Sequence, residues 1–201
     1  MIKAIIFDSG GVIVNQKSLF DKFVKIFQLK NIKKFWREVN IKAIPLCKGK
    51  ISEQEFWAQI AKSTRISLDK VPKNLWTKNY EKLTHLNKDV LNIIKALKQN
   101  YKLALVSNSI ASHTKINEKR DIYNFFNVVI LSHKIGLTKD NEKIFLIAAR
   151  KLNVKPQECI FIDDIKDFVI TAKSVGMKGI LFKNSKKLEL DLKKLLITKR
   201  Y

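Results

Sequence analysis

Short apolar runs alternate with amphipathic segments along most of the chain. Five runs have the length and composition of buried strands: residues 2–7, 103–106, 128–131, 159–162 and 180–182. Four segments carry apolar residues at helical spacing: residues 90–97, 144–152, 169–175 and 188–197. Strands that alternate with helices predict an α/β fold, namely a doubly wound parallel sheet with helices on both faces.

Residues 16–85 break this alternation, because their apolar positions recur only at helical spacing. Ser52 and Glu55 predict a capping box at the start of one of these helices. Helix breaks are expected at three residues: Pro45, Gly49 and Pro72. Residues 16–85 are therefore predicted to form an all-helical second domain, inserted into a core domain of residues 1–15 and 86–201.

Acidic residues follow two of the predicted strands. Asp8 ends the first run and precedes a turn of small residues, whereas Asp163 and Asp164 end the fourth. The carboxyl ends of the strands form the usual ligand crevice of an open α/β sheet. One shared site that holds a metal ion is the interpretation we favour. The alternative is that these aspartates cap helices after βα loops, which explains one such residue better than it explains the set.

Composition limits the classes of protein that fit. The 201 residues include 40 basic and 18 acidic side chains, a net charge of +22. No window reaches the apolar length of a transmembrane helix, and the chain begins directly with a strand, so we expect neither a membrane segment nor a secretory signal. Cys47 and Cys159 lie far apart, which favours free thiols in the cytoplasm. The lysines are scattered over nearly every segment, which favours a generally cationic surface over a nucleic-acid partner.

Four short motifs resemble those of the haloacid dehalogenase-like (HAD) hydrolase superfamily, in the same order and at similar spacing. They are Phe7 to Val14, Val106-Ser107-Asn108, Gly136 to Lys139, and Phe161-Ile162-Asp163-Asp164. The helical insert, with residues 49–57, resembles the four-helix cap of the sugar-phosphatase-like branch. The resemblance spans essentially the whole chain and implies a Rossmann-like core with an inserted helical cap.

The resemblance also implies a mechanism. Asp8 would be the nucleophile, which attacks a phosphoryl group to give an aspartyl-phosphate that water then hydrolyses. Mg²⁺ would be held by Asp8 and Asp164, with Asp163 as a second or outer-shell ligand. The backbone carbonyl of Gly10 would complete the protein's ligands.

Further residues of the motifs would bind the phosphoryl group. Lys139 would supply a fixed positive charge to the nucleophile and the phosphoryl oxygens. Ser107 would donate a hydrogen bond to a phosphoryl oxygen, together with the backbone N–H groups of Ser9, Gly10 and Asn108. Taken alone, Ser107 is equally an ordinary strand-end cap and Lys139 one of many surface lysines.

Three positions depart from the family's pattern. Gly10 stands where the commonest first motif has a second Asp that protonates the leaving group, a contribution of typically ~10²–10⁴-fold. Either the leaving group then needs little help, or a water or a cap residue supplies the proton. The segment Asp140-Asn141-Glu142 replaces Pro-Asp-Pro after the lysine, which predicts a less rigid helix start. Phe168 replaces a polar residue that supports the metal site, which predicts a lower metal affinity.

We therefore predict a Mg²⁺-dependent phosphatase that acts on a small phosphorylated metabolite, such as a sugar phosphate, as a cytoplasmic monomer or homodimer. One alternative is a catalytically weakened protein that binds an anionic partner, which Gly10, Phe168 and the net charge favour. A metal-free dehalogenase also lacks the second Asp, but the Asp163-Asp164 pair argues against it. Isolated histidines and the tryptophans of the insert are interpreted as packing residues, although one tryptophan could face the substrate: His85, His113, His133, Trp36, Trp57 and Trp76.

Overall fold

A five-stranded, all-parallel sheet forms the centre of the molecule. The computed structural model describes residues 1–65, 67, 71 and 73–196. The strand order is β5-β4-β1-β6-β7. The strands are β1 (Ala4–Phe7), β4 (Lys102–Ser107), β5 (Val128–Leu131), β6 (Cys159–Asp163) and β7 (Lys178–Leu181). Each strand overlaps one of the predicted apolar runs, so the α/β prediction is confirmed.

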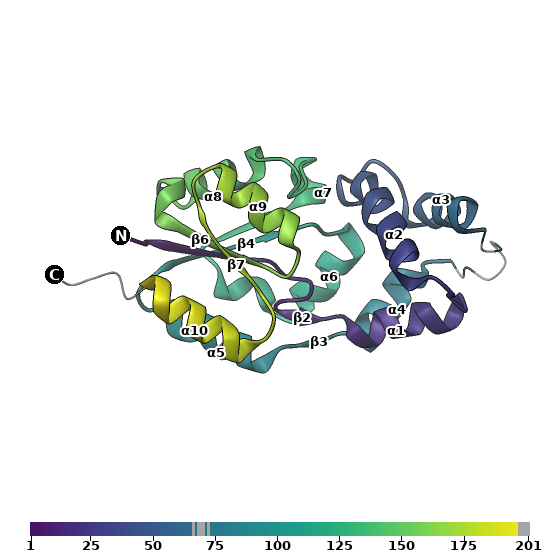
Figure 1. Ribbon diagram of the computed structural model, residues 1–201, viewed down its shortest axis with the longest axis horizontal. Coiled ribbons are helices and arrows are strands. Elements are labelled where there is room, and N and C mark those ends of the chain that lie inside the picture. Colours follow the sequence, from purple (N-terminus) through teal and green to yellow (C-terminus); the bar gives the residue numbers. More distant parts are fainter. Residues whose placement is uncertain (66, 68–70, 72, 197–201) are drawn as a thin grey trace.

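Helices cover both faces of this sheet, as Figure 1 shows. On one face, Ala4 and Ile6 pack in a cluster with α8 (Lys143–Lys151) and α9 (Lys166–Ser174). On the other face, Ile5 and Phe7 pack with residues of three further helices. These helices are α5 (Lys88–Leu97), α6 (Ala111–Lys119) and α10 (Ser185–Leu196). Because successive side chains of a strand point to opposite faces, a continuous apolar run fits a strand that is buried on both sides.

Four helices lie beyond the carboxyl ends of the strands (Figure 1). They are α1 (Lys17–Ile26), α2 (Ile32–Cys47), α3 (Glu53–Thr64) and α4 (Leu75–Leu83). The chain enters and leaves this helical part through β2 (Val14–Asn15) and β3 (His85–Leu86), which pair antiparallel. The predicted domain boundaries at residues 15/16 and 85/86 fall at this two-stranded ladder. The division into two domains remains a prediction.

One predicted helix break is wrong. Pro45 lies inside α2, which continues to Cys47. Pro45 cannot donate a hydrogen bond to the carbonyl of Ile41, but the helix continues through it because Val39 and Leu46 on either side are buried in the core. Gly49 follows the end of α2 with a φ of +70°, as expected for a break. Pro72 lies outside the described residues.

Other local predictions hold. The Ser52 Oγ accepts a hydrogen bond from the Glu55 backbone N–H at 3.2 Å, and the Glu55 carboxylate accepts one from the Ser52 N–H at 2.7 Å. This is the predicted capping box at the start of α3. The predicted helix of residues 169–175 is α9, which ends at Ser174 with Val175 as its cap residue and is followed by Gly176 at φ +94°. None of the described helices combines the length and apolar character needed to cross a bilayer.

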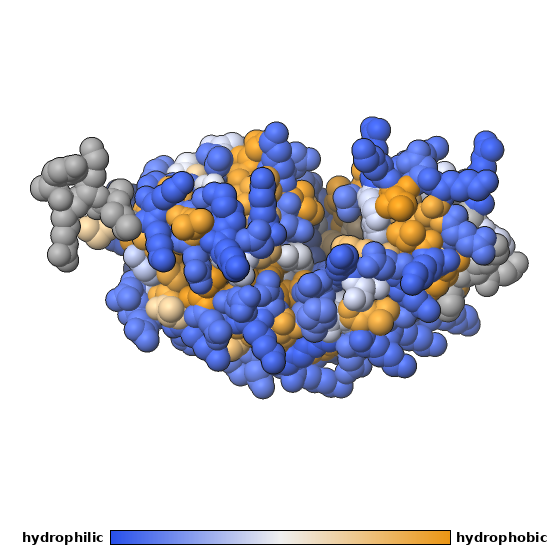
Figure 2. Space-filling view, turned by 60° about the horizontal axis from the view of Figure 1, so that its bottom comes forward, coloured by the Kyte–Doolittle hydropathy of each residue, from blue (hydrophilic) through white to orange (hydrophobic). Residues whose placement is uncertain are grey.

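A cleft separates the α/β part from the helical part. Figure 2 shows this cleft as a notch between two lobes whose visible surface is mostly hydrophilic. The apolar core is continuous beneath it, because Phe23 and Trp57 of the helical part belong to the same cluster as Phe7 of the central strand. Six described elements have no counterpart in the prediction: β2, β3, α6, α7 (Ser132–Ile135) and the 3₁₀ turns Ile122–Phe125 and Pro156–Glu158. Five of them are single short turns or ladders, whereas α6 is a full helix whose buried side chains are mostly polar, so it carries no apolar periodicity.

Candidate active site

A buried lysine joins the two strand ends that carry aspartates. Lys139 Nζ lies 2.6 Å from Asp8 Oδ1 and 2.5 Å from Asp163 Oδ2. All three side chains are almost completely buried. β1 and β6 are neighbours in register, with Phe7 opposite Ile162, so Asp8 and Asp163 emerge side by side. The structure thus brings together residues that lie more than 130 positions apart in the sequence.

Burial and charge shift the pKa values of these groups in defined directions. Burial raises the pKa of Asp8 to about 8, with the carboxylates of Asp163 and Asp164 acting in the same direction and the Lys139 ammonium opposing it. Burial raises the pKa of Asp164 to about 6, aided by Asp163. Burial alone would lower the pKa of Lys139, but Asp163 and Asp8 together outweigh it and raise that pKa. Lys139 is therefore a permanent cation beside an excess of carboxylate.

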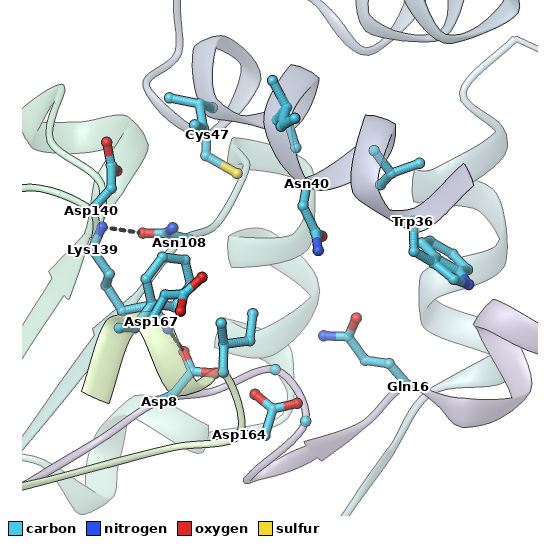
Figure 3. Close-up of a pocket in the computed structure, with 18 of the residues that line it drawn as sticks. Asp8, Gln16, Trp36, Asn40, Cys47, Asn108, Lys139, Asp140, Asp164 and Asp167 are labelled. Carbon is cyan, nitrogen blue, oxygen red and sulfur yellow. Dashed lines mark hydrogen bonds and ion pairs between the residues drawn. The ribbon is translucent and has the colours of Figure 1, made fainter. Parts of the chain in front are cut away.

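The two aspartates at the end of β6 have different surroundings. The Asp163 carboxylate is fully engaged, because Oδ2 pairs with Lys139 and Oδ1 accepts the Ile165 backbone N–H at 2.8 Å. The Asp164 carboxylate instead lines the cavity and points toward it in Figure 3. It lies so close to Gly11 that a Cβ there would overlap it. Gly11 also has a φ of +83°, so glycine is required at this position for two reasons.

These carboxylates suit a divalent cation. One oxygen each from Asp8, Asp163 and Asp164 can lie within 4.8 Å of one another. Oxygen ligands of this kind are those that Mg²⁺ uses in proteins. Three carboxylates face a single ammonium, so a bound cation would relieve the repulsion that adds to burial in raising the pKa of Asp8 and Asp164.

The residues expected to bind phosphoryl oxygens surround the same strand ends. Asn108 lines the cavity, and its Oδ1 accepts the backbone N–H of Lys139 at 2.9 Å, which fixes the loop that carries the lysine. Gly10 also lines the cavity. Ser107 is buried at the end of β4, and Ser9 is buried next to Asp8. Neither serine belongs to the cavity wall, and the Ser9 hydroxyl has no hydrogen-bond partner in the described part of the chain.

Gln16 is a candidate site residue that sequence reasoning missed. Its side chain lines the cavity, and its amide points toward Asp164 in Figure 3. A Cβ added to Gly10 would overlap Gln16 Nε2 and lie 3.4 Å from Gln16 Cδ. The amide therefore fills the space into which a side chain at position 10 would extend. The sequence shows that position 10 carries no acid, but it does not show that the Gln16 amide, six positions away, fills this space.

The other departures from the family's pattern have local explanations. Phe168 lines the cavity, and its ring centroid lies 4.8 Å from Lys139 Nζ. An aromatic face at this distance attracts the ammonium without accepting a hydrogen bond. Asn141 accepts the Lys143 backbone N–H at 3.0 Å, and Glu142 accepts a hydrogen bond from Ser174 at 2.7 Å. These contacts hold the start of α8 without the expected prolines.

The histidines and tryptophans interpreted as packing residues include two that line the cavity. His113 is buried and stacks on Tyr80 with centroids 3.8 Å apart, which is a packing role. Trp57 is buried among the helices. Trp36 and Trp76 line the cavity, so two tryptophans face it rather than one. Trp36 could not be assigned to the cavity from the sequence, because its position there depends on how α2 is oriented in three dimensions.

Comparison with known proteins identifies the family of the chain. A family model for haloacid dehalogenase-like hydrolases matches residues 2–176. The glyceraldehyde 3-phosphate phosphatase of Pyrococcus furiosus is 35% identical over 103 residues, which are 50% of this chain and 42% of that protein. The D-ribitol-5-phosphate phosphatase of Bacteroides thetaiotaomicron is 25% identical over 192 residues, 89% of this chain and 90% of that protein. The chain thus spans less than half the length of the first of these relatives.

Solved structures share the fold. A HAD family enzyme from Bacteroides thetaiotaomicron, in complex with magnesium and inorganic phosphate, superposes with a TM-score of 0.68 at 23% identity. That match covers 91% of this chain and 95% of the other. A HAD-hydrolase from Bacillus subtilis bound to magnesium, described as putative, gives 0.74 at 15% identity, covering 98% and 99%. Because the family model matches most of its residues, the chain belongs to the haloacid dehalogenase-like hydrolases.

Proposed function

We propose that this protein is a Mg²⁺-dependent phosphatase that hydrolyses a small phosphorylated metabolite through an aspartyl-phosphate on Asp8. The observation that carries the proposal is the buried constellation of Asp8, Lys139 and Asp163, with Asp164 facing the same cavity. Relatives that are named as phosphatases of glyceraldehyde 3-phosphate and D-ribitol 5-phosphate support the substrate class.

The proposed reaction has two displacements at phosphorus. In the first, a carboxylate oxygen of Asp8 forms a bond to phosphorus while the bond from phosphorus to the leaving oxygen breaks. The leaving oxygen takes a proton and departs as the alcohol. In the second, a water oxygen attacks the same phosphorus, loses a proton, and releases inorganic phosphate and the Asp8 carboxylate.

Asp8 and Asp164, with the backbone carbonyl of Gly10, are the groups that would hold Mg²⁺. When bound, the ion would neutralise charge that otherwise keeps a carboxylate and a phosphate dianion apart. Asp163 has a different role in this proposal, because both of its oxygens already accept hydrogen bonds. It fixes Lys139 in place and acts on the reaction through that residue.

Lys139 would hold the phosphoryl group against Asp8. Its ammonium already contacts the nucleophile at 2.6 Å and is fixed by Asp163, so it needs no reorganisation when charge develops on the phosphoryl oxygens. The Ser107 hydroxyl and the N–H groups of Ser9, Gly10 and Asn108 would complete the phosphoryl site as donors.

Detection of the covalent intermediate tests this function. The protein is mixed with Mg²⁺ and acetyl phosphate, quenched in acid, and digested for mass spectrometry. A phosphoryl group on the peptide that contains Asp8, removed by hydroxylamine, is the expected result, since acyl phosphates react with hydroxylamine and phosphate esters do not. Release of phosphate should require Mg²⁺. Strong retention on heparin with no adduct and no turnover would instead identify a protein that binds anionic partners.

The cavity itself does not favour the two alternatives. Among the described residues that line it, Lys139 is the only basic one, although the chain carries a net charge of +22. An anionic polymer would therefore find its cations elsewhere on the surface. A metal-free dehalogenase has no need for two further carboxylates beside Asp8, and their mutual repulsion would be a cost. We also propose a cytoplasmic monomer or homodimer, which the free thiols of Cys47 and Cys159 support.

A further inference from the structure

One face of α2 forms the wall of the cavity opposite the strand ends. Trp36, Asn40, Ala43 and Cys47 line the cavity and recur at intervals of four, three and four residues. This is the spacing of a single helix face. Figure 3 shows Cys47, Asn40 and Trp36 in a row along α2, with Asp8, Lys139 and Asp164 across the cavity. A substrate whose phosphoryl group lies at Asp8 would extend its leaving group toward this row.

The α2 wall is apolar and aromatic. The Trp36 ring packs against Phe20 with centroids 4.6 Å apart, and both rings line the cavity. Burial raises the pKa of the Cys47 thiol to about 12, so this side chain is an uncharged, weakly polar neighbour. The cavity has a volume of about 520 Å³, within the range of small-molecule sites. From the described helical part, Asn40 and Gln16 are the only polar side chains that line it.

Charge in the cavity disfavours a second anionic group on the substrate. Lys139 is the only basic residue among the described lining residues, and it already pairs with two carboxylates. Asp140 and Asp167 line the cavity in addition to Asp8 and Asp164. A second phosphate or a carboxylate on the leaving group would therefore be desolvated without a partner cation, which is unfavourable.

We propose that the substrate is a phosphomonoester whose leaving group is uncharged and places an apolar, preferably aromatic, face against Phe20 and Trp36. Asn40 then provides one hydrogen bond to a polar group on that leaving group. This inference rests on the proposed function, because it takes the phosphoryl group to lie at Asp8. It excludes bisphosphates and phosphorylated acids, and it ranks arylalkyl phosphates above polyol phosphates.

Binding of phosphonates tests the inference separately from turnover, because a phosphonate keeps the anionic head and cannot be hydrolysed. Three ligands differ only in the tail: 3-phenylpropylphosphonate, 3,4-dihydroxybutylphosphonate and butane-1,4-bisphosphonate. We expect calorimetry of the Mg²⁺-loaded protein to show the phenyl ligand binding at least about tenfold tighter than the diol, because burying a ring contributes that much or more. The bisphosphonate should bind most weakly. Equal affinities, a reversed order or no binding would overturn the inference.

Two variants locate the effect on α2. Trp36→Ala should reduce the affinity for 3-phenylpropylphosphonate, relative to methylphosphonate, at least about tenfold. Arg37→Ala is the matched control, because Arg37 is exposed on the same helix and does not line the cavity. Asn40→Arg adds a cation at an exposed cavity position and should tighten bisphosphonate binding at least about tenfold. Unchanged binding in both Trp36→Ala and Asn40→Arg would overturn the assignment.

The two proposals fail in different ways. If acetyl phosphate leaves no adduct on Asp8 and releases no phosphate, the phosphatase proposal fails, and the substrate inference fails with it. If the adduct forms but the diol or the bisphosphonate binds as tightly as the phenyl ligand, only the inference about the α2 wall fails.

Discussion

Gly10→Asp should raise the turnover of alkyl phosphates far more than that of aryl phosphates. Alkoxides are poor leaving groups and depend on a proton donor, whereas phenolates depart with little help. General acid catalysis contributes typically ~10²–10⁴-fold, or about 3–5 kcal/mol at ~1.4 kcal/mol per factor of ten. The wild-type protein should therefore show a steep dependence of kcat/KM on the leaving group.

The fit of the new side chain sets the net gain. Gly10 does not have a positive φ, so the backbone accepts a side chain there. The new Cβ would overlap Gln16 Nε2 but would lie 3.4 Å from Gln16 Cδ, so only the amide end must turn away. Rotation of a terminal amide into a less favoured position costs about 0.5–1.5 kcal/mol. The expected net gain for alkyl esters is then about 10- to 10³-fold.

The assay is kcat/KM over a series of aryl and alkyl phosphates with Mg²⁺ present, for the wild type and three variants. Gly10→Asn is the matched control, because it has the size of Asp but cannot donate a carboxylic proton. The double variant Gly10→Asp with Gln16→Ala removes the overlap and should add up to about tenfold to the gain. A flat wild-type series would refute the reasoning, since another group would already be supplying the proton. An equal gain from Gly10→Asn would refute the proton as the cause.

Three further results are expected. Asp8→Asn should lower kcat by about 10⁴–10⁶-fold while the fold is retained, because an amide is a poor nucleophile; near-normal kcat in a folded protein would remove Asp8 from the mechanism. In Mg²⁺ titrations, Asp163→Ala should weaken metal dependence by about 10–100-fold, as a supporting group does, and Asp164→Ala by more; the reverse order would exchange their roles. Burial, with a smaller contribution from Arg120, lowers the pKa of His113 from 6.5 to about 3, so the unfolded chain binds more protons below pH 6.5. The free energy of unfolding should therefore fall by about 1.4 kcal/mol for each pH unit as the pH drops from 6.5 to about 3. His113→Phe should flatten that slope in denaturant titrations at several pH values, and an unchanged slope would contradict this assignment.

The strand-end residues could be predicted because their positions are set by local pattern. A buried parallel strand reads as an apolar run, and the residue after the run lies at the sheet edge where ligands bind. Asp8, Asp163 and Asp164 follow directly from this rule. Placing Lys139 beside Asp8 needed the resemblance as well, because a lysine in a chain with 40 basic residues carries no signal of its own. Its second pairing, with Asp163, was not predicted.

The α2 wall could not be predicted, because it depends on how a helix is oriented across a cleft. Helical spacing shows that Trp36 and Asn40 share a face, but α2 is apolar on more than one side, with Phe35 and Leu46 buried in the core and away from the cavity. Which face meets the sheet is decided by tertiary packing. The same limit applies to Gln16, which lies at the start of α1 and gains its place beside Gly10 from the turn between them.

Net charge and local charge act over different distances in this molecule. A surface with a net charge of +22 attracts anionic metabolites from solution, but salt screens that attraction beyond about 8–10 Å at physiological ionic strength. Inside the cavity, Lys139 faces Asp8, Asp140, Asp164 and Asp167, so the local balance is negative until a cation binds. Under the proposed function, a phosphate dianion would be drawn toward the protein by its surface and would enter the cavity only together with a metal. The separation of a basic surface from an acidic cavity explains how a strongly basic chain can carry an acidic site. It also explains why the net charge of the chain gives no indication of the charge inside that site.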